Sequence, residues 1–156
     1  MKAIEPWFLT SDRMGASTNK GATNAAIAAG IRYHKRMYKT FKLQCAINFP
    51  EWKLMIEPWF RTAAYKLRSP DSVLVDEAGK RAIVIEVKKN WQDGRDVKLL
   101  DEYLPIVQSA LGVKTYPLMV VGNVRGLKHA PLLSFKDILL PLDWKPGMPT
   151  PTLLAL

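Results

Sequence analysis

The sequence has very little cysteine and no long apolar run. Cys45 is the only cysteine among the 156 residues, which excludes an internal disulfide and a zinc site built from several cysteines. Its apolar stretches, such as PLMVV at 117–121, are too short to cross a bilayer, and no apolar secretory segment follows a basic start at the N-terminus. We therefore expect a cytoplasmic protein with no membrane partner.

Acidic residues are missing from most of the N-terminal half. None lies between Asp12 and Glu51, and residues 1–69 carry 12 basic and 4 acidic side chains, against 11 and 10 in residues 70–156. The whole chain has a net charge of +9. This asymmetry favours a polyanionic partner, and we expect DNA. A phosphate-binding loop of the form G-x-x-x-x-G-K-[ST] is also absent, which argues against an ATP-driven motor.

The chain is interpreted as a single domain, 1–156, in three parts. Residues 1–22 are rich in small polar residues and are predicted to form a mobile basic arm. Residues 23–121 form the core, and residues 122–156 form a proline-rich C-terminal extension. The segment IEPWF occurs at 4–8 and again at 56–60. Two copies are too few for a solenoid, and both a chance duplication and a competing edge strand stay open.

Apolar periodicity predicts two helices. The first is capped by Thr23 or Asn24 and runs to Lys42. Its core-facing residues are predicted to be Ile27, Ile31, His34, Tyr38 and Phe41. The second covers residues 96–110, with a kink or late start at Pro105 and a C-terminal cap at Gly112.

Short β-rich segments lie between and after these helices. They cover residues 43–49, 52–60 with an interruption at Pro58, 72–75, 81–88 and 116–121. Residues 72–75 and 81–88 form a hairpin whose turn offers Gly79 for a positive φ, and the second arm is apolar on both faces, as in a central strand. Beyond residue 122 we expect loop, one helical turn near 134–139 and a loosely held tail. The pattern predicts an α/β fold of order α-β-β-β-α-β, a mixed central sheet flanked by helices.

Three charged residues lie at the ends of this hairpin. Asp71 begins the first arm, and Glu86 and Lys88 project from one face at the end of the second, so the two carboxylates lie close together. Carboxylates so placed repel unless a cation lies between them, and a hard divalent ion suits oxygen ligands. With Lys88 beside an attacking water, such a site could hydrolyse a phosphodiester. A buried Glu–Lys pair with a turn aspartate is the structural alternative.

Pro70-Asp71 followed by Glu86-Val87-Lys88 resembles the signature of the PD-(D/E)XK nuclease superfamily. The predicted element order is similar to that superfamily's restriction-endonuclease-like core, and the resemblance covers roughly residues 24–121. It implies a metal-dependent deoxyribonuclease in which Asp71, Glu86 and the Val87 carbonyl bind Mg²⁺ or Mn²⁺. Lys88 then serves the attacking water. Many members also carry a glutamate in the first helix, and this chain has none there.

The first helix resembles that of the RecB-like branch, which includes phage-encoded exonucleases. This likeness, carried by Gly30-Ile31-Arg32-Tyr33-His34, implies that His34 is a metal ligand, whereas a histidine that only packs in the core is the alternative. That branch tends to have a glutamine four residues before a tyrosine in the second helix; here Tyr103 is preceded by Leu99. The residues predicted to contact DNA are Arg32, Lys35, Arg36, Lys39, Lys98 and Tyr103.

Three functions stay open from the sequence. The first is a phage-type recombination, replication or repair nuclease that acts on DNA ends or single strands. Its expected location is the cytoplasm, and a phage-infected host cell is one such setting. The second is a junction-resolving endonuclease of the same fold, which needs a symmetric dimer. The third is a DNA-binding protein without catalysis. A homodimer or higher oligomer, the polarity of cleavage and activity on RNA are left open by the sequence.

Overall fold

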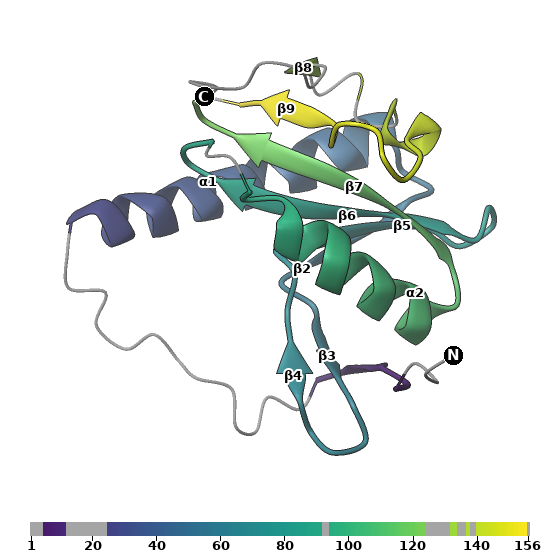
Figure 1. Ribbon diagram of the computed structural model, residues 1–156. Coiled ribbons are helices and arrows are strands. Elements are labelled where there is room, and N and C mark those ends of the chain that lie inside the picture. The colour runs from purple at the N-terminus through teal and green to yellow at the C-terminus, as the bar shows by residue number, and fades with distance from the viewer. Residues whose placement is uncertain are drawn as a thin grey trace.

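A mixed six-stranded sheet with helices on both faces forms the centre of the molecule (Figure 1). The computed structural model describes residues 5–11, 25–91, 94–123, 132–133, 137 and 140–155. The sheet contains β2 (Lys53–Ile56), β5 (Ser72–Asp76), β6 (Arg81–Lys88), β7 (Lys114–Val121), β8 (Leu132–Leu133) and β9 (Thr152–Leu154), in the order β2-β5-β6-β7-β9-β8. The predicted α/β class is therefore confirmed.

The first helix is longer than predicted. α1 runs over Ala25–Asn48, so the strand expected at 43–49 is wrong. Tyr33, Met37, Phe41 and Cys45 are buried at steps of four, and this row continues the apolar face one turn beyond the predicted end. The expected face is also displaced, because Ile27 and Ile31 are exposed while Tyr33 and Met37 are buried.

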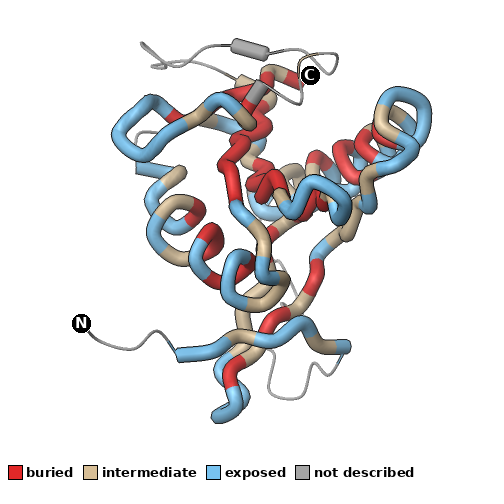
Figure 2. The backbone as a smooth tube through the Cα atoms, turned by 90° about the vertical axis from the view of Figure 1, so that its right-hand side faces the viewer, coloured by how far each residue is buried: buried red, intermediate tan, exposed pale blue. Residues whose placement is uncertain are grey.

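The predicted hairpin is formed by β5 and β6. The strands pair antiparallel, with Ser72 opposite Ile85, and β6 also pairs in parallel with β7, which places it in the middle of the sheet. Figure 2 shows buried residues along the strands of this sheet. The positive φ of the turn, 51°, belongs to Lys80 and not to Gly79 as predicted. A Cβ at Gly79 would instead crowd the Asp76 carboxylate, so a larger residue there would require that side chain to shift.

The second helix begins with an irregular turn. Leu99–Tyr103 is a π-helix, and α2 (Leu104–Leu111) follows with Pro105 in its first turn. Proline lacks the N–H that would continue a regular ladder, and the regular α-helix begins only at Leu104, as the predicted late start requires. Gly112 has φ 64° and its N–H donates to the Gln108 carbonyl, so the predicted cap is confirmed.

The C-terminal tail is not loosely held, and that prediction is wrong. β9 pairs in parallel with β7 and buries Leu153, and a 3-10 helix covers Leu140–Asp143. The Tyr33 hydroxyl donates to the Ala155 carbonyl at 2.6 Å, which joins the tail to α1. The helical turn predicted at 134–139 lies outside the described residues except for residue 137.

A second sheet joins the two IEPWF copies. β1 (Phe8–Thr10), β3 (Trp59–Arg61) and β4 (Leu67–Arg68) lie in the order β1-β3-β4, all antiparallel, with Phe8 opposite Arg61. β1 therefore corrects the prediction of a mobile basic arm for the residues that it covers; residues 1–4 and 12–22 of that arm lie outside the described part. The strand expected at 52–60 is divided between the two sheets at Glu57 and Pro58, because proline interrupts it as predicted.

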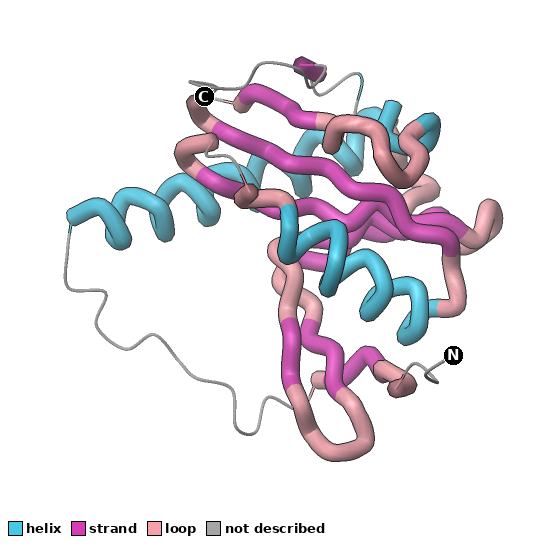
Figure 3. Tube along the Cα trace, in the orientation of Figure 1, coloured by secondary structure: helices cyan, strands magenta, loops and turns pink. Residues whose placement is uncertain are grey.

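Two apolar clusters hold the helices against the main sheet. α1 packs with Leu74, Ile85 and Val87 on one face, and α2 packs with Val73 and Val84 on the other (Figure 3). Neighbouring residues of β6 thus alternate between the two clusters, as side chains do along any strand. In the part of the chain that the structure describes, none of the helices has both the length and the apolar character that spanning a membrane requires.

Candidate functional site

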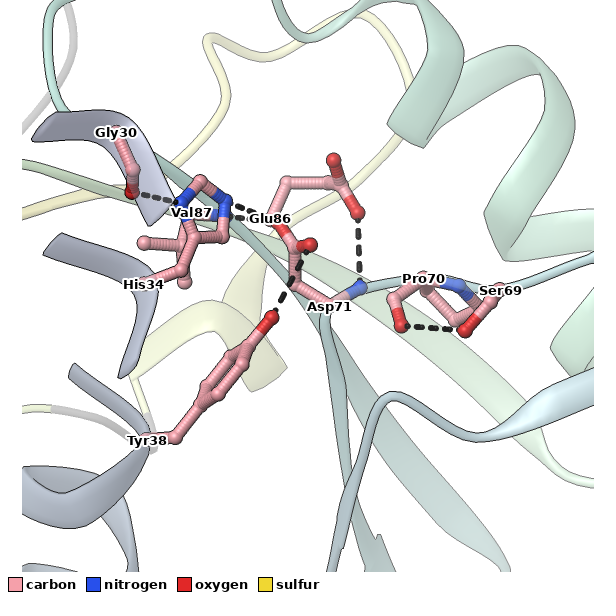
Figure 4. Close-up of polar contacts among 8 residues, drawn as sticks. All are labelled: Gly30, His34, Tyr38, Ser69, Pro70, Asp71, Glu86 and Val87. Atoms are coloured by element: carbon pink, nitrogen blue, oxygen red, sulfur yellow. Dashed lines mark hydrogen bonds and ion pairs between the residues drawn. The ribbon is translucent and has the colours of Figure 1, made fainter. Parts of the chain in front are cut away.

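Asp71 is the junction of the candidate site. It lies directly before β5, and its Oδ2 accepts a hydrogen bond of 2.7 Å from the Val87 N–H on β6 (Figure 4). Its Oδ1 accepts one of 3.4 Å from the Tyr38 hydroxyl on α1. The carboxylate therefore lies between the end of the β5–β6 pair and the first helix.

Glu86 lies beside Asp71 on the neighbouring strand. Its Oε1 accepts a hydrogen bond of 3.1 Å from the Asp71 N–H, and only 6% of its surface is exposed. Because Val84 packs with α2 and Val87 with α1, the alternation of β6 directs Glu86 toward the α2 side. Burial, and next the charge of Asp71, raise the pKa of the Glu86 carboxyl to about 8.

His34 reaches Asp71 from α1. The His34 Nδ1–H donates to the Gly30 carbonyl at 2.8 Å, which leaves Nε2 directed at Asp71 Oδ2, 3.5 Å away (Figure 4). Burial by itself lowers the pKa of His34, but the hydrogen bond and charge of Asp71 outweigh it, so the net shift is upward. A pocket of about 320 Å³ opens here, lined in part by Lys35, Tyr38 and Glu57.

The donor atoms fit a hard divalent cation in kind, but they are not gathered around one point. Among the described residues, no three His, Cys, Asp or Glu side chains form a group that could hold a metal ion. The reason is that His34 approaches Asp71 from the α1 side while Glu86 projects toward α2. An imidazole nitrogen and two carboxylates are nevertheless suitable ligands for Mg²⁺ or Mn²⁺. The bond from His34 Nδ1–H to a backbone carbonyl is also the usual support of a metal-binding histidine.

Lys88 ends the strand that carries Glu86. Its side chain is half-buried, and its positive charge partly opposes the upward pKa shifts of both His34 and Glu86. The lysine is therefore close enough to act electrostatically on both sides of the site. The structure thus brings His34, Asp71, Glu86 and Lys88 to one end of the main sheet.

The residues predicted to contact DNA lie on two surfaces. On α1, four exposed cationic side chains flank His34: Arg32, Lys35, Arg36 and Lys39. Near the second helix, the Lys98 ammonium lies 5.2 Å from the centre of the Tyr103 ring. Tyr103 is buried. Of this pair, Lys98 is therefore the side chain that presents itself to a ligand.

Sequence reasoning missed two participants. The apolar pattern of the first helix predicts only core packing for Tyr38, although its position four residues after His34 places both on one helix face. Glu57 lines the pocket beside them, and its N–H donates to the Asp71 carbonyl at 2.8 Å. In the sequence, Glu57 is marked only by its neighbour Pro58, which predicts an interruption of the strand and not a functional site.

Comparison with known proteins adds no family. No protein-family model matches this chain, and no curated protein matches it in sequence. A function for the chain therefore depends on the residues and geometry described above.

Proposed function

We propose that this chain is a divalent-metal-dependent DNA nuclease of the PD-(D/E)XK type, which hydrolyses phosphodiester bonds at DNA ends or in single strands. The observation that carries this proposal is the position of Asp71, which meets His34 from α1 and Glu86 from β6 at one end of the sheet. The order of α1, β2, β5, β6, α2 and β7 along the chain supports the restriction-endonuclease-like core.

Each residue has a distinct part in this chemistry. His34, Asp71, Glu86 and the Val87 carbonyl would hold Mg²⁺ or Mn²⁺, and the bound ion would supply Lewis acidity and a more acidic water. Tyr38 and the Val87 N–H fix the Asp71 carboxylate through the hydrogen bonds described above. The Lys88 ammonium orients the attacking water and stabilises negative charge that develops on the phosphate.

Lys88 provides the test. Wild-type protein and Lys88→Ala are incubated with linear duplex, single-stranded DNA or a four-way junction, in Mg²⁺, Mn²⁺ or EDTA. We expect wild-type cleavage in either metal and none in EDTA. In Lys88→Ala we expect a loss of at least about a hundredfold, the usual contribution of a group of this kind, with DNA binding kept. Cleavage of Lys88→Ala at the wild-type rate would contradict the assignment, and selective cleavage of the junction would favour a resolving endonuclease.

One observation favours a second candidate, a DNA-binding protein without catalysis. The side chains of the described residues do not form a metal-binding group as they stand. Failure of every substrate to be cleaved in either metal, with salt-sensitive DNA binding retained, would support this candidate over the nuclease.

A further inference from the structure

The small sheet presents aromatic and cationic side chains on the side away from α2. Phe60, in the middle of β3, is buried in the cluster that contains α2, so its neighbours Trp59 and Arg61 project to the opposite side. Phe8 lies directly opposite Arg61 on β1 and is 46% exposed. Tyr65, in the turn between β3 and β4, is 51% exposed. We call this set, Phe8, Trp59, Arg61 and Tyr65, the outer face.

Arg61 lies between the two exposed rings. Its guanidinium carbon is 4.8 Å from the centre of the Tyr65 ring and 5.7 Å from that of Phe8. Its Nη1 donates to the Thr62 carbonyl at 3.2 Å, which fixes the side chain. In the described part of the chain no carboxylate forms an ion pair with Arg61, in contrast to Arg68, which pairs with Glu102 on the other face. Its positive charge is thus available to an anion.

Tyr65 occupies a backbone conformation that side chains disfavour. Its φ is 63°, in the left-handed region, and a bulky residue there costs free energy. The turn is held by hydrogen bonds from the Tyr65 N–H to the Thr62 carbonyl and from the Lys66 N–H to Thr62 Oγ1. Asparagine or glycine would suit this position better, so the turn by itself does not account for a tyrosine here.

The outer face adjoins the candidate active site along the chain. β3 begins two residues after Glu57, which lines the His34 pocket, and β4 ends three residues before Asp71. Arg61 is four residues from Glu57, about 13 Å along an extended chain. Figure 3 shows the β3–β4 hairpin extending from this part of the main sheet. An extended polymer on the outer face would therefore lead toward the site.

We propose that the outer face binds single-stranded nucleic acid, with bases stacked on Phe8 and Tyr65 and Arg61 contacting the strand between them. Exposed rings interleaved with cations are the recognition elements for single strands, since every unpaired base offers a face for stacking. A duplex conceals those faces between base pairs, which makes it the poorer ligand. The further statement that this surface delivers the strand to Asp71 and Glu86 rests on the proposed nuclease function.

The test measures binding without cleavage. Fluorescence anisotropy in EDTA compares labelled oligothymidine, an abasic oligomer of the same length and a duplex, for wild type and for Phe8→Ala/Tyr65→Asn. Asparagine keeps the left-handed turn while removing the ring. We expect the double variant to bind oligothymidine about tenfold more weakly or worse and to bind the abasic oligomer as before. Arg61→Ala should weaken both, whereas Lys114→Ala, which removes a cation 5.5 Å from the Tyr116 ring at the start of β7, should change them little.

Several outcomes would overturn the proposal. If wild-type protein binds oligothymidine and the abasic oligomer with equal affinity, stacking is excluded. The single variant Tyr65→Asn leaves Phe8 in place and so tests the ring without disturbing β1. Wild-type affinity for oligothymidine in both this variant and the double variant would also exclude stacking. Light scattering of wild type and the double variant tests whether the outer face binds a second copy of the chain. If wild type is a dimer, the double variant is a monomer and DNA binding is unchanged, the face is a dimer interface. If stacking is found but Mn²⁺ produces no cleavage in wild type, the outer-face proposal stands and the nuclease proposal fails.

Discussion

At the scale of single residues, Asp71 links the elements that form the site. It joins α1 through Tyr38 and His34, and it joins β6 through the Val87 N–H and Glu86. Glu86 accepts one hydrogen bond, from the Asp71 N–H, and is more deeply buried. The two carboxylates therefore differ: Asp71 stabilises the fold through its hydrogen bonds, whereas Glu86 costs free energy when it is charged and no cation is bound.

Glu86→Gln is expected to stabilise the metal-free protein at alkaline pH. The pKa of Glu86 rises from 4.5 to about 8 on folding. The folded state thus keeps a proton that the unfolded state loses, and the free energy of unfolding falls as the pH rises through this window. Glutamine stays neutral, so in EDTA the variant should be more stable than wild type by roughly 1–3 kcal/mol at about pH 9 and nearly equal at about pH 4.

Urea unfolding at the two pH values measures this effect. Asp76→Asn is the control, because it removes a carboxylate that pairs with Arg81 away from Glu86 and should give no gain in stability at alkaline pH. A gain in stability for Glu86→Gln that is independent of pH would show that the burial of charge is not its cause.

His34→Ala is expected to lose most activity and to stay folded. Its side chain is 25% exposed and touches the site more than the core, so the melting temperature should fall by only a few degrees. Imidazole suits Mn²⁺ better than Mg²⁺, and raising the Mn²⁺ concentration should restore part of the lost cleavage. To check this, activity and melting temperature are measured over one Mn²⁺ titration. Lys42→Ala, which changes an exposed residue of the same helix, is the control. Loss of activity only through unfolding would return His34 to core packing.

At the scale of elements, β9 completes the core that α1 covers. Leu153 is fully buried in the same cluster as Phe41 and Cys45, and the parallel pairing with β7 holds it there. Gly122, just after β7, allows this end of the sheet to approach α1, because a Cβ there would lie 3.2 Å from the Tyr33 ring and 2.9 Å from the Lys89 carbonyl. The last strand is therefore part of the folding unit.

Leu153→Ala should destabilise the protein by about 2–5 kcal/mol, the cost of a cavity in a packed core. The measurement is urea unfolding. Leu43→Ala is the matched control, since Leu43 is exposed on α1 and its loss should change stability by less than about 0.5 kcal/mol. Equal stability of the two variants would mean that the C-terminal strand is not held as the structure places it.

At the scale of the whole molecule, positive charge and the candidate site lie together. α1 contributes an exposed cationic face beside His34, while the helices and strands after residue 70 are close to neutral. Such a distribution attracts a polyanion to the α1 side of the sheet without selecting a sequence.

Arg36→Ala/Lys39→Ala should reduce the salt dependence of DNA binding. Each phosphate contact releases counterions, so the slope of log affinity against log salt should fall by about two in magnitude for the pair. Anisotropy over a salt series measures the slope. Lys114→Ala/Lys145→Ala removes the same amount of positive charge from exposed positions elsewhere. This variant should keep most of the wild-type salt dependence. Equal slopes for the two double variants would place DNA away from α1.

Local patterns account for the parts that sequence reasoning predicted. Alternation and a turn predicted the β5–β6 hairpin, a glycine predicted the end of α2, and the spacing from Asp71 to Glu86 placed both residues on neighbouring arms of that hairpin. Each of these depends on residues that are close in sequence, where backbone geometry follows from residue type.

Long-range contacts account for the errors. Residues 43–48 are helical and not a strand, because Leu43, Gln44 and Ala46 favour a helix and α1 packs Phe41 and Cys45 against the sheet. The tail becomes β9, and Phe8–Thr10 becomes β1, only because β7 and β3 offer partners far away in the chain. Tyr38 and Glu57 likewise join the site through contacts with Asp71 across the fold. Residue order alone thus predicts the hairpin and its charged ends, whereas pairing and packing free energy, which depends on distant partners, decides the remaining strands and the surroundings of Asp71.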